Sequence, residues 1–280
     1  MPSLPNFIYI GAAKAGSTWI YSALRGHPQV FVPITKRTFF FDRNYAHGLE
    51  WYLQHFEPSA AQVAVGEICH DYFLSAEVAD RIARDLPDAK LICCLRDPVD
   101  RLVSAYLHER EHGSANAASF DQFVTDEENL RKSDYIANLS PFLERFPRER
   151  LLVLLYDDLC EDPAAFYRRI CEFLGIDAHW EPDMLRRRVN ATRRVRFPSI
   201  ARWVYRKARS RSHADHAATL QNRLRFALMT RLSRLLYSNR KPHVSIDADT
   251  RRRLRQRFGE GLSMLESALG LRLPETWWTD

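Results

Sequence analysis

The stretch from Phe7 to Trp19, FIYIGAAKAGSTW, combines residue types suited to binding an anion. Apolar residues run into a loop of small residues, and Ser17 and Thr18 follow, which predicts a strand, a loop and the start of a helix. The first amides of a helix have no intrahelical acceptor, and the helix dipole adds partial positive charge there. We therefore expect a phosphate or sulfate at Gly16, Ser17 and Thr18, with Lys14 as a nearby cation.

This loop departs from the Walker A pattern G-x-x-x-x-G-K-[ST]. Gly16 is followed by Ser17, and the loop lysine, Lys14, comes two residues before Gly16. The departure disfavours magnesium-nucleotide chemistry. A phosphotransferase related to P-loop nucleotide kinases stays open as an alternative, as does a glycine turn with a surface lysine.

A second anion site is predicted after the apolar run at 90–95, KLICCL, which is typical of a strand buried in a parallel sheet. Arg96 follows this strand, and Asp97 and Pro98 begin a helix that carries Ser104. A guanidinium and a hydroxyl could hold an anion there. Two anion sites at neighbouring strand ends fit a ligand with two phosphate-like groups.

Two candidates for a general base follow the strand expected at 62–68. Glu67 lies at its carboxyl end, where ligands bind in open α/β sheets, and His70 comes three residues later. Either could take a proton from a hydroxyl or amine. A structural carboxylate and a solvated loop histidine are the alternatives. Lys36, after the short strand expected at 29–32, could reach the same anion as Lys14.

The alternation of strands and helices predicts an α/β fold of the P-loop type, with three layers and a central parallel sheet flanked by helices. With 280 residues, of which 46% are hydrophobic, the chain can form one domain over residues 1–280. We expect an α/β core over residues 1–200 and a helical C-terminal region over 200–280. Leucines from 220 to 236 recur at helical spacing, which predicts a core helix, with a lid over a lipidic ligand or a membrane surface contact as alternatives.

The net charge of +6 is concentrated in the segment 186–211, which has eleven Arg or Lys residues and no Asp or Glu. Such a segment suits an anionic partner, so a non-enzymatic module that binds nucleic acid or another anion is a further alternative. The five cysteines suggest free thiols in a reducing compartment, and we find no signal peptide or long apolar run. We expect a cytoplasmic protein, and contact with a membrane surface is the alternative.

The segment His108-Glu109-Arg110-Glu111-His112 matches H-E-x-x-H on an expected helix. That pattern can bind zinc in metalloproteases. No third ligand is placed by a recognisable spacing, so we expect no metal here.

These motifs together resemble the sulfotransferases that use 3′-phosphoadenosine 5′-phosphosulfate (PAPS). The loop Lys14-Ala15-Gly16-Ser17-Thr18-Trp19 is similar to their 5′-phosphosulfate loop, and Arg96 with Ser104 eight residues later to their 3′-phosphate motif. Tyr156, in YDDL, resembles a tyrosine that lies against adenine. The resemblance covers Phe7 to about Asn190 and also the tail that ends in Trp277-Trp278.

The chain resembles bacterial relatives of the heparan sulfate sulfotransferases, in which Glu67 of GEICHDY would match a glutamate base. Two departures are Ile68, where those proteins often have Lys, and Arg37-Thr38 in place of Glu-Pro. The resemblance also implies that Trp19 stacks on adenine. A basic loop should cover the 3′-phosphate, with Arg193, Arg194 and Arg196 as its candidates.

The resemblance implies in-line transfer of a sulfuryl group from PAPS to a hydroxyl or amine, leaving adenosine 3′,5′-bisphosphate. Lys14 would neutralise the leaving group, Arg96 and Ser104 would hold the 3′-phosphate, and Glu67 or His70 would deprotonate the acceptor. No metal is expected. The acceptor would be a carbohydrate, a lipid or another natural product, and nucleic acid is not an expected partner.

Overall fold

The computed structural model describes residues 4–112, 117–182 and 246–279, together with positions 185, 194, 195, 237, 238 and 244. Its centre is a five-stranded parallel sheet of order β2-β3-β1-β4-β5. The strands are β1 (Phe7–Gly11), β2 (Val30–Phe31), β3 (Ala64–Ile68), β4 (Lys90–Leu95) and β5 (Leu151–Leu155). The expected α/β fold with a central parallel sheet is therefore confirmed.

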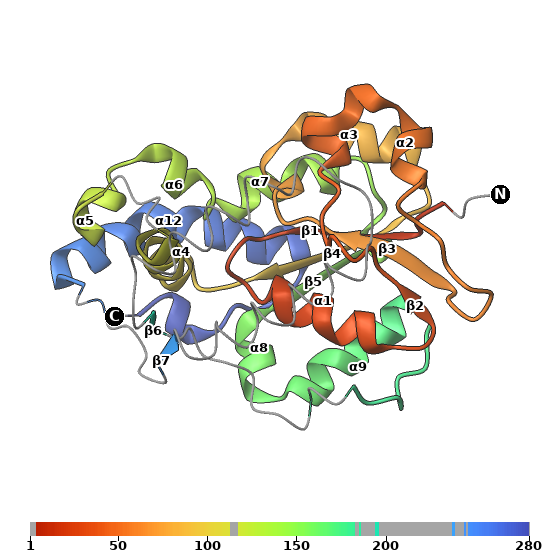
Figure 1. Cartoon of the computed structure of the whole chain (residues 1–280). Helices are drawn as coiled ribbons and strands as arrows, with labels where there is room; N and C mark the ends of the chain where they lie inside the picture. Colours follow the sequence, from red (N-terminus) through yellow and green to blue (C-terminus); the bar gives the residue numbers. More distant parts are fainter. Residues whose placement is uncertain are drawn as a thin grey trace. The chain divides into compact units, whose positions relative to one another are not determined.

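Helices cover both faces of this sheet. Figure 1 shows α1, α8 and α9 on one face and α2, α3 and α7 on the other, and α12 packs against α7. Ten helices are described: α1 (Ser17–Gly26), α2 (Leu49–Leu53), α3 (Ala76–Asp85), α4 (Pro98–His112), α5 (Phe120–Phe123), α6 (Glu127–Arg131), α7 (Tyr135–Leu143), α8 (Tyr156–Glu161), α9 (Pro163–Leu174) and α12 (Ala248–Leu269).

The sheet strands form where the sequence is mostly apolar, and all five residues of β1 and β3 are buried, including Glu67 of β3. Strands covered on both faces need apolar side chains on both sides. Helix α9 begins after Asp162, whose Oδ1 accepts hydrogen bonds from the amides of Ala164 and Ala165 at 3.0 and 2.9 Å. It ends at Gly175, whose φ of 76° favours glycine.

The chain forms two compact units. The first comprises Met1–Arg101, Glu127–Val189 and Ala248–Asp280, and contains the whole parallel sheet. The second comprises Leu102–Asp126 and Asn190–Asp247, and includes the antiparallel pair β6 (Arg194–Val195) and β7 (Tyr237–Ser238). The expected division near residue 200 stays a prediction. Among the described residues, no helix has the length and apolar character needed to cross a membrane.

Candidate active site

The loop between β1 and α1 has the backbone expected of an anion-binding turn. Lys14 and Gly16 have φ values of 69° and 89°, so the chain bends sharply before Ser17 begins the helix. A Cβ atom on Gly16 would lie 3.0 Å from Leu159 Cδ2 and 3.4 Å from Tyr156 Cδ2. The positive φ therefore favours glycine at this position, and a side chain there would press against Leu159 and Tyr156. The first turn of α1 has no acidic residue, which leaves its positive end available to an external anion.

Arg96 and Tyr156 lie beside this loop. The guanidinium carbon of Arg96 is 4.8 Å from the centroid of the Tyr156 ring, and the same ring would meet a Cβ atom placed on Gly16. Arg96 Nη2 forms an ion pair with Asp100 at 3.2 Å. Its Nε is buried and has no hydrogen-bond partner within the described part of the chain. Because a buried donor normally has an acceptor, this atom is suited to an anionic ligand.

Lys36 approaches the start of α1 from the segment that follows β2. Its Nζ donates to Ser17 Oγ at 3.3 Å and to Thr18 Oγ1 at 3.2 Å. Burial, together with the neighbouring charge of Arg37, lowers the pKa of Lys36 from 10.5 to about 8. The loop thus has a second ammonium group beside Lys14.

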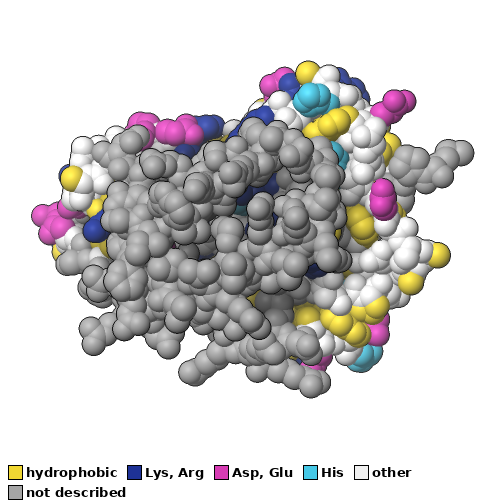
Figure 2. All heavy atoms as spheres, viewed as in Figure 1, with side chains coloured by type: hydrophobic (Ala, Val, Ile, Leu, Met, Phe, Trp, Pro, Cys, Tyr) yellow, Lys and Arg dark blue, Asp and Glu magenta, His cyan; other side chains and the backbone are white. Residues whose placement is uncertain are grey.

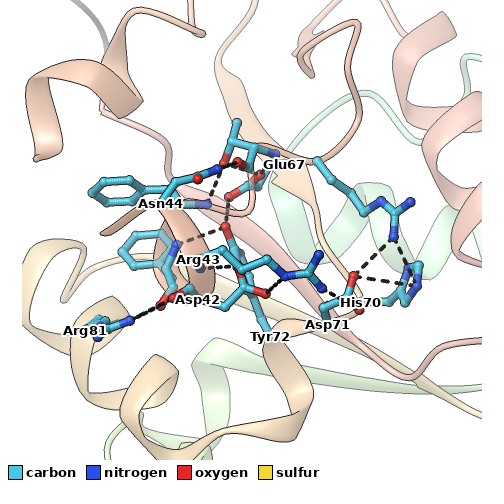
Figure 3. A network of polar contacts seen from close by, with 12 residues as sticks. Asp42, Arg43, Asn44, Glu67, His70, Asp71, Tyr72 and Arg81 are labelled. Carbon is cyan, nitrogen blue, oxygen red and sulfur yellow. Dashed lines mark hydrogen bonds and ion pairs between the residues drawn. The ribbon is translucent and has the colours of Figure 1, made fainter. Parts of the chain in front are cut away.

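Glu67 is fully buried at 0% exposure, and both of its carboxylate oxygens are occupied. Oε2 accepts from the backbone N and the Oγ1 of Thr38, each at 2.9 Å. Oε1 accepts from the hydroxyls of Tyr52 at 3.1 Å and Tyr72 at 2.7 Å. Burial raises the pKa of Glu67 above 4.5, and the hydrogen bonds from Thr38, Tyr72 and Tyr52 oppose that rise. Figure 3 shows the carboxylate inside this network.

His70 lies at the other end of the network in Figure 3, beside Asp71 and Arg37. Its Nε2 is 3.4 Å from Arg37 Nη1 and 3.8 Å from Asp71 Oδ2, and Arg37 forms an ion pair with Asp71 at 3.1 Å. Burial lowers the pKa of His70 from 6.5 to about 4, so the ring is neutral at pH 7. Its Nδ1 is buried and lacks a partner among the described residues.

The charges of Lys14 and Lys36 also lower the pKa of His70, which places these cations near its ring. Some Lys and Arg side chains are visible toward the upper middle of the face in Figure 2. The site therefore combines an anion-binding loop, several cations and one neutral imidazole.

A model of the sulfotransferase domain matches residues 4–199. The chain belongs to the sulfotransferase family. It is 32% identical over 200 residues to mouse bifunctional heparan sulfate N-deacetylase/N-sulfotransferase 4, covering 63% of this chain and 23% of that protein. It is 31% identical over 183 residues to mouse heparan sulfate glucosamine 3-O-sulfotransferase 3B1, covering 62% of this chain and 46% of that protein. The chain spans less than half of the length of these relatives.

Solved structures agree on the fold. A sulfotransferase from Alicyclobacillus acidocaldarius superposes with a TM-score of 0.72 at 22% identity, covering 99% of this chain and 100% of that one. A mouse sulfotransferase in complex with PAP superposes with a TM-score of 0.51 at 14% identity, over 95% of this chain and 87% of that one. The α/β architecture is thus that of sulfotransferases.

The remaining predicted site residues are Trp19, Ser104 and the arginines of the basic loop. Trp19 is only 5% exposed and packs edge-on against Phe166 with ring centroids 5.7 Å apart, so its adenine contact stays a prediction. Ser104 lies on α4 in the second compact unit, and its phosphate contact also stays a prediction. Arg194 lies in β6, whereas Arg193, Arg196 and the leucine stripe at 220–236 lie outside the described residues.

The H-E-x-x-H segment shows no metal cluster in the part of the chain that can be described. There, no three His, Cys, Asp or Glu side chains are grouped so that they could hold an ion. All five cysteines are free, four of them buried, as the sequence suggested.

Several residues of the site were missed by sequence reasoning. Thr38, Tyr52 and Tyr72 hold Glu67, and Asp71 pairs with Arg37 beside His70. The sequence signal for Asp71 is its position next to His70, but Tyr52 is fifteen positions from Glu67 and only the fold brings the two together.

Proposed function

We propose that this sulfotransferase moves a sulfuryl group from PAPS to a hydroxyl or amine of a carbohydrate acceptor. The observation that carries the proposal is the position of the Tyr156 ring, which lies against the Arg96 guanidinium and 3.4 Å from where a Cβ atom on Gly16 would be, so that one side chain adjoins both anion-binding elements. A nucleotide with a phosphosulfate at one end and a 3′-phosphate at the other needs two such elements. The unpartnered Nε of Arg96 and the positive φ at Gly16 fit these two groups.

In this proposal the chain's own residues supply position and charge. PAPS, when bound, contributes the activated sulfuryl group with its phosphate as leaving group. The amides at the start of α1 hold the 5′ end, and Lys14 stabilises the negative charge that develops on the leaving oxygen. Arg96 holds the 3′-phosphate, and Tyr156 lies between the two anion-binding elements.

We assign the role of general base to His70 rather than Glu67. The Glu67 carboxylate is surrounded by four protein donors and has no exposed surface, so an acceptor has no access to it without breaking these bonds. His70 is neutral at pH 7, has an unpartnered Nδ1 and lies near Lys14 and Lys36. A neutral imidazole is the protonation state that accepts a proton.

The tautomer of His70 decides which nitrogen acts. When the proton is on Nε2, Nδ1 has a free lone pair and the Nε2–H faces Asp71. Asp71 then orients the ring and stabilises the imidazolium after proton transfer. The hydrogen bond from Arg37 to Nε2 requires the other tautomer, so Arg37 must retain only its ion pair with Asp71 during catalysis.

The carbohydrate acceptor is supported by the similarity to two heparan sulfate sulfotransferases of mouse, one acting on nitrogen and the other on a 3-hydroxyl by name. Because one relative is named for transfer to nitrogen and the other for transfer to oxygen, either atom of the acceptor can be the attacking one in this proposal. Lipids and other natural products remain alternative acceptors, and the transfer experiment below includes lipids.

Calorimetry with adenosine 3′,5′-bisphosphate, compared with ATP plus Mg²⁺, tests the donor site. We expect binding of the bisphosphate and no comparable binding of ATP. Transfer of labelled sulfate from PAPS to pooled oligosaccharides, aminosugars and lipids then tests the reaction, with Lys14→Ala as the control expected to lose turnover. The absence of bisphosphate binding would overturn the proposed function.

A further inference from the structure

Lys36 lies outside both anion-binding motifs, although the sequence made it a candidate to reach the same anion as Lys14. It belongs neither to the β1–α1 loop nor to the segment around Arg96, but its ammonium lies within 3.3 Å of hydroxyls from the first two residues of α1. An amine held against two hydroxyls beside a helix N-terminus faces the same region as the amides that bind an anion.

The backbone around Lys36 is fixed from two directions. Lys36 has a φ of 65°, and its carbonyl accepts from the amide of Ile68 in β3 at 3.3 Å. Two residues later, Thr38 is bound through both its amide and its hydroxyl to the buried Glu67. A non-glycine residue with positive φ persists where the surrounding contacts determine it, so Lys36 is held in place rather than free on a surface.

The charge balance around Lys36 favours an anionic ligand. The cations Lys14 and Arg37 repel the protonated Lys36 ammonium and so lower its pKa, and the Tyr21 ring lies 5.9 Å from Lys36 Nζ. Asp71 is the nearby carboxylate, and it already pairs with Arg37 and Arg43. The groups that face Lys36 are Lys14 and Tyr21 from the first βα unit, Arg37 from its own segment, and Cys69, His70 and Asp71 after β3.

We propose that Lys36 is a second donor-binding cation, which contacts the 5′-phosphate end of the bound nucleotide together with Lys14. This inference rests on the proposed function. An approaching phosphate takes the place of water around the ammonium and adds the negative charge that the site lacks. Ser17 and Thr18 position the ammonium before the ligand arrives.

The proposal has a consequence that can be measured without turnover. Because Lys36 has a pKa of about 8 in the free protein, a bound anion must raise that value. Bisphosphate binding at pH 8 should therefore take up about half a proton. Over the same range, affinity should fall as the pH rises above 8, since a proton must then be supplied for binding.

Neighbouring groups do not account for such an uptake. The pKa of His70 is about 4, so this ring remains neutral at pH 8 even if the ligand raises its pKa by two units. The pKa of the buried Cys69 thiol is raised well above 9.0, mainly by burial, so it is already protonated.

The test is titration calorimetry of adenosine 3′,5′-bisphosphate at pH 8 in two buffers of different ionisation enthalpy. Wild type is compared with Lys36→Arg, Lys36→Gln and the surface control Lys132→Gln. We expect about half a proton of uptake in wild type and Lys132→Gln. We expect tight binding without uptake in Lys36→Arg, since arginine stays protonated, and about tenfold to hundredfold weaker binding in Lys36→Gln.

The outcomes separate this inference from the proposed function. If wild type binds the bisphosphate, and Lys36→Gln binds it equally well with the same proton uptake, the role of Lys36 is overturned but the proposed function is not. Wild type that does not bind the bisphosphate overturns both. Thermal unfolding of each variant establishes that it is folded, and Lys36→Arg retains the charge if Lys36→Gln fails to fold.

Discussion

Glu67 Oε1 accepts a hydrogen bond from the hydroxyl of Tyr72 at 2.7 Å, and that hydroxyl accepts from the amide of Phe41 at 3.2 Å. The other carboxylate oxygen forms a matching chain through Thr38 Oγ1, which accepts from the amide of Phe40 at 3.1 Å. The carboxylate thus connects β3 to the segment that carries Lys36. In this arrangement Glu67 is a positioning residue.

Replacement of Glu67 should reduce stability. Glu67→Ala leaves four donors without their acceptor in a site that excludes water, which we expect to lower the free energy of unfolding by about 3 kcal/mol or more. Glu67→Gln places an amide N–H₂ against donors and should lower it by about 1–3 kcal/mol. Urea unfolding measures both. Glu77→Gln, which affects an exposed ion pair with Arg81, is the control and should change stability by less than about 1 kcal/mol.

The pH dependence of this effect has a definite sign. Burial raises the pKa of Glu67 in the folded state above 4.5, so the native protein binds this proton more tightly than the unfolded chain does. The contribution of Glu67 to stability is then largest below pH 4.5 and falls as the pH rises through the folded pKa. The difference in unfolding free energy between wild type and Glu67→Gln should shrink over that range, and a difference that grows instead would contradict this assignment.

His70 should titrate at a higher pH when Arg37 is removed. The charge of Arg37 lowers the pKa of His70, and the charge of Asp71 raises it. Arg37→Met removes the lowering charge and also removes the ion pair between Arg37 and Asp71. Both changes raise the pKa of His70 from about 4 toward 6.5. NMR titration of the imidazole, assigned with His70→Gln, measures the shift.

Arg43→Met is the matched control for this titration, because Arg43 also pairs with Asp71 but is not among the charges that most affect His70. If His70 is the base, the acid limb of kcat/KM should move with the measured pKa in Arg37→Met. Because the folded pKa lies below 6.5, the stability contributed by His70 is lost as the pH falls from 6.5 through about 4 in wild type. An unmoved imidazole titration in Arg37→Met would exclude the electrostatic role given to Arg37.

The sequence was sufficient for the sheet and for the turn between β1 and α1, because each rests on local patterns. Mostly apolar stretches mark the strands, and Gly16 and Lys14 mark a βα turn. The role of Glu67 could not be predicted in the same way, because its burial depends on Tyr52 and Thr38 from distant segments. A carboxylate at a strand end looks the same in sequence whether it faces a ligand or the core.

Arg96 should determine affinity for the 3′-phosphate. Its backbone carbonyl accepts from the hydroxyl of Tyr135 at 2.5 Å, and its side chain lies on Tyr156 with an unpartnered buried Nε among the described residues. Arg96→Ala should weaken bisphosphate binding by about tenfold to hundredfold, as for loss of a charged hydrogen bond. Calorimetry checks this. The variant Arg150→Ala, which alters a surface contact with Asp88, should bind as wild type does.

Binding of adenosine 5′-phosphosulfate, which lacks the 3′-phosphate, sharpens the assignment of Arg96. If Arg96 contacts that phosphate, Arg96→Ala should bind the shortened ligand about as well as wild type does. An equal loss of affinity for both ligands would mean that Arg96 acts elsewhere in the site.

The ion pair between Arg255 and Asp97 couples the C-terminal helix to the residue that follows Arg96. The two side chains are 13% and 9% exposed. Arg255 also donates to the carbonyls of Thr276 and Trp277, at 2.8 and 2.7 Å, while Asp97 Oδ1 accepts from the amide of Asp100 at 2.8 Å. Removal of one partner leaves the other charge buried, so Arg255→Met and Asp97→Asn should each lower the free energy of unfolding by about 3–5 kcal/mol.

A double-mutant cycle tests this coupling. Arg255→Met combined with Asp97→Asn should lower stability by less than the sum of the single changes, with a coupling free energy of about 1–3 kcal/mol. Additive losses would show that the two residues act independently. Because Asp97 is adjacent to Arg96 and caps α4, movement of the α4 start should displace the Arg96 guanidinium. Arg255→Met should therefore also weaken bisphosphate binding under conditions where the variant is fully folded.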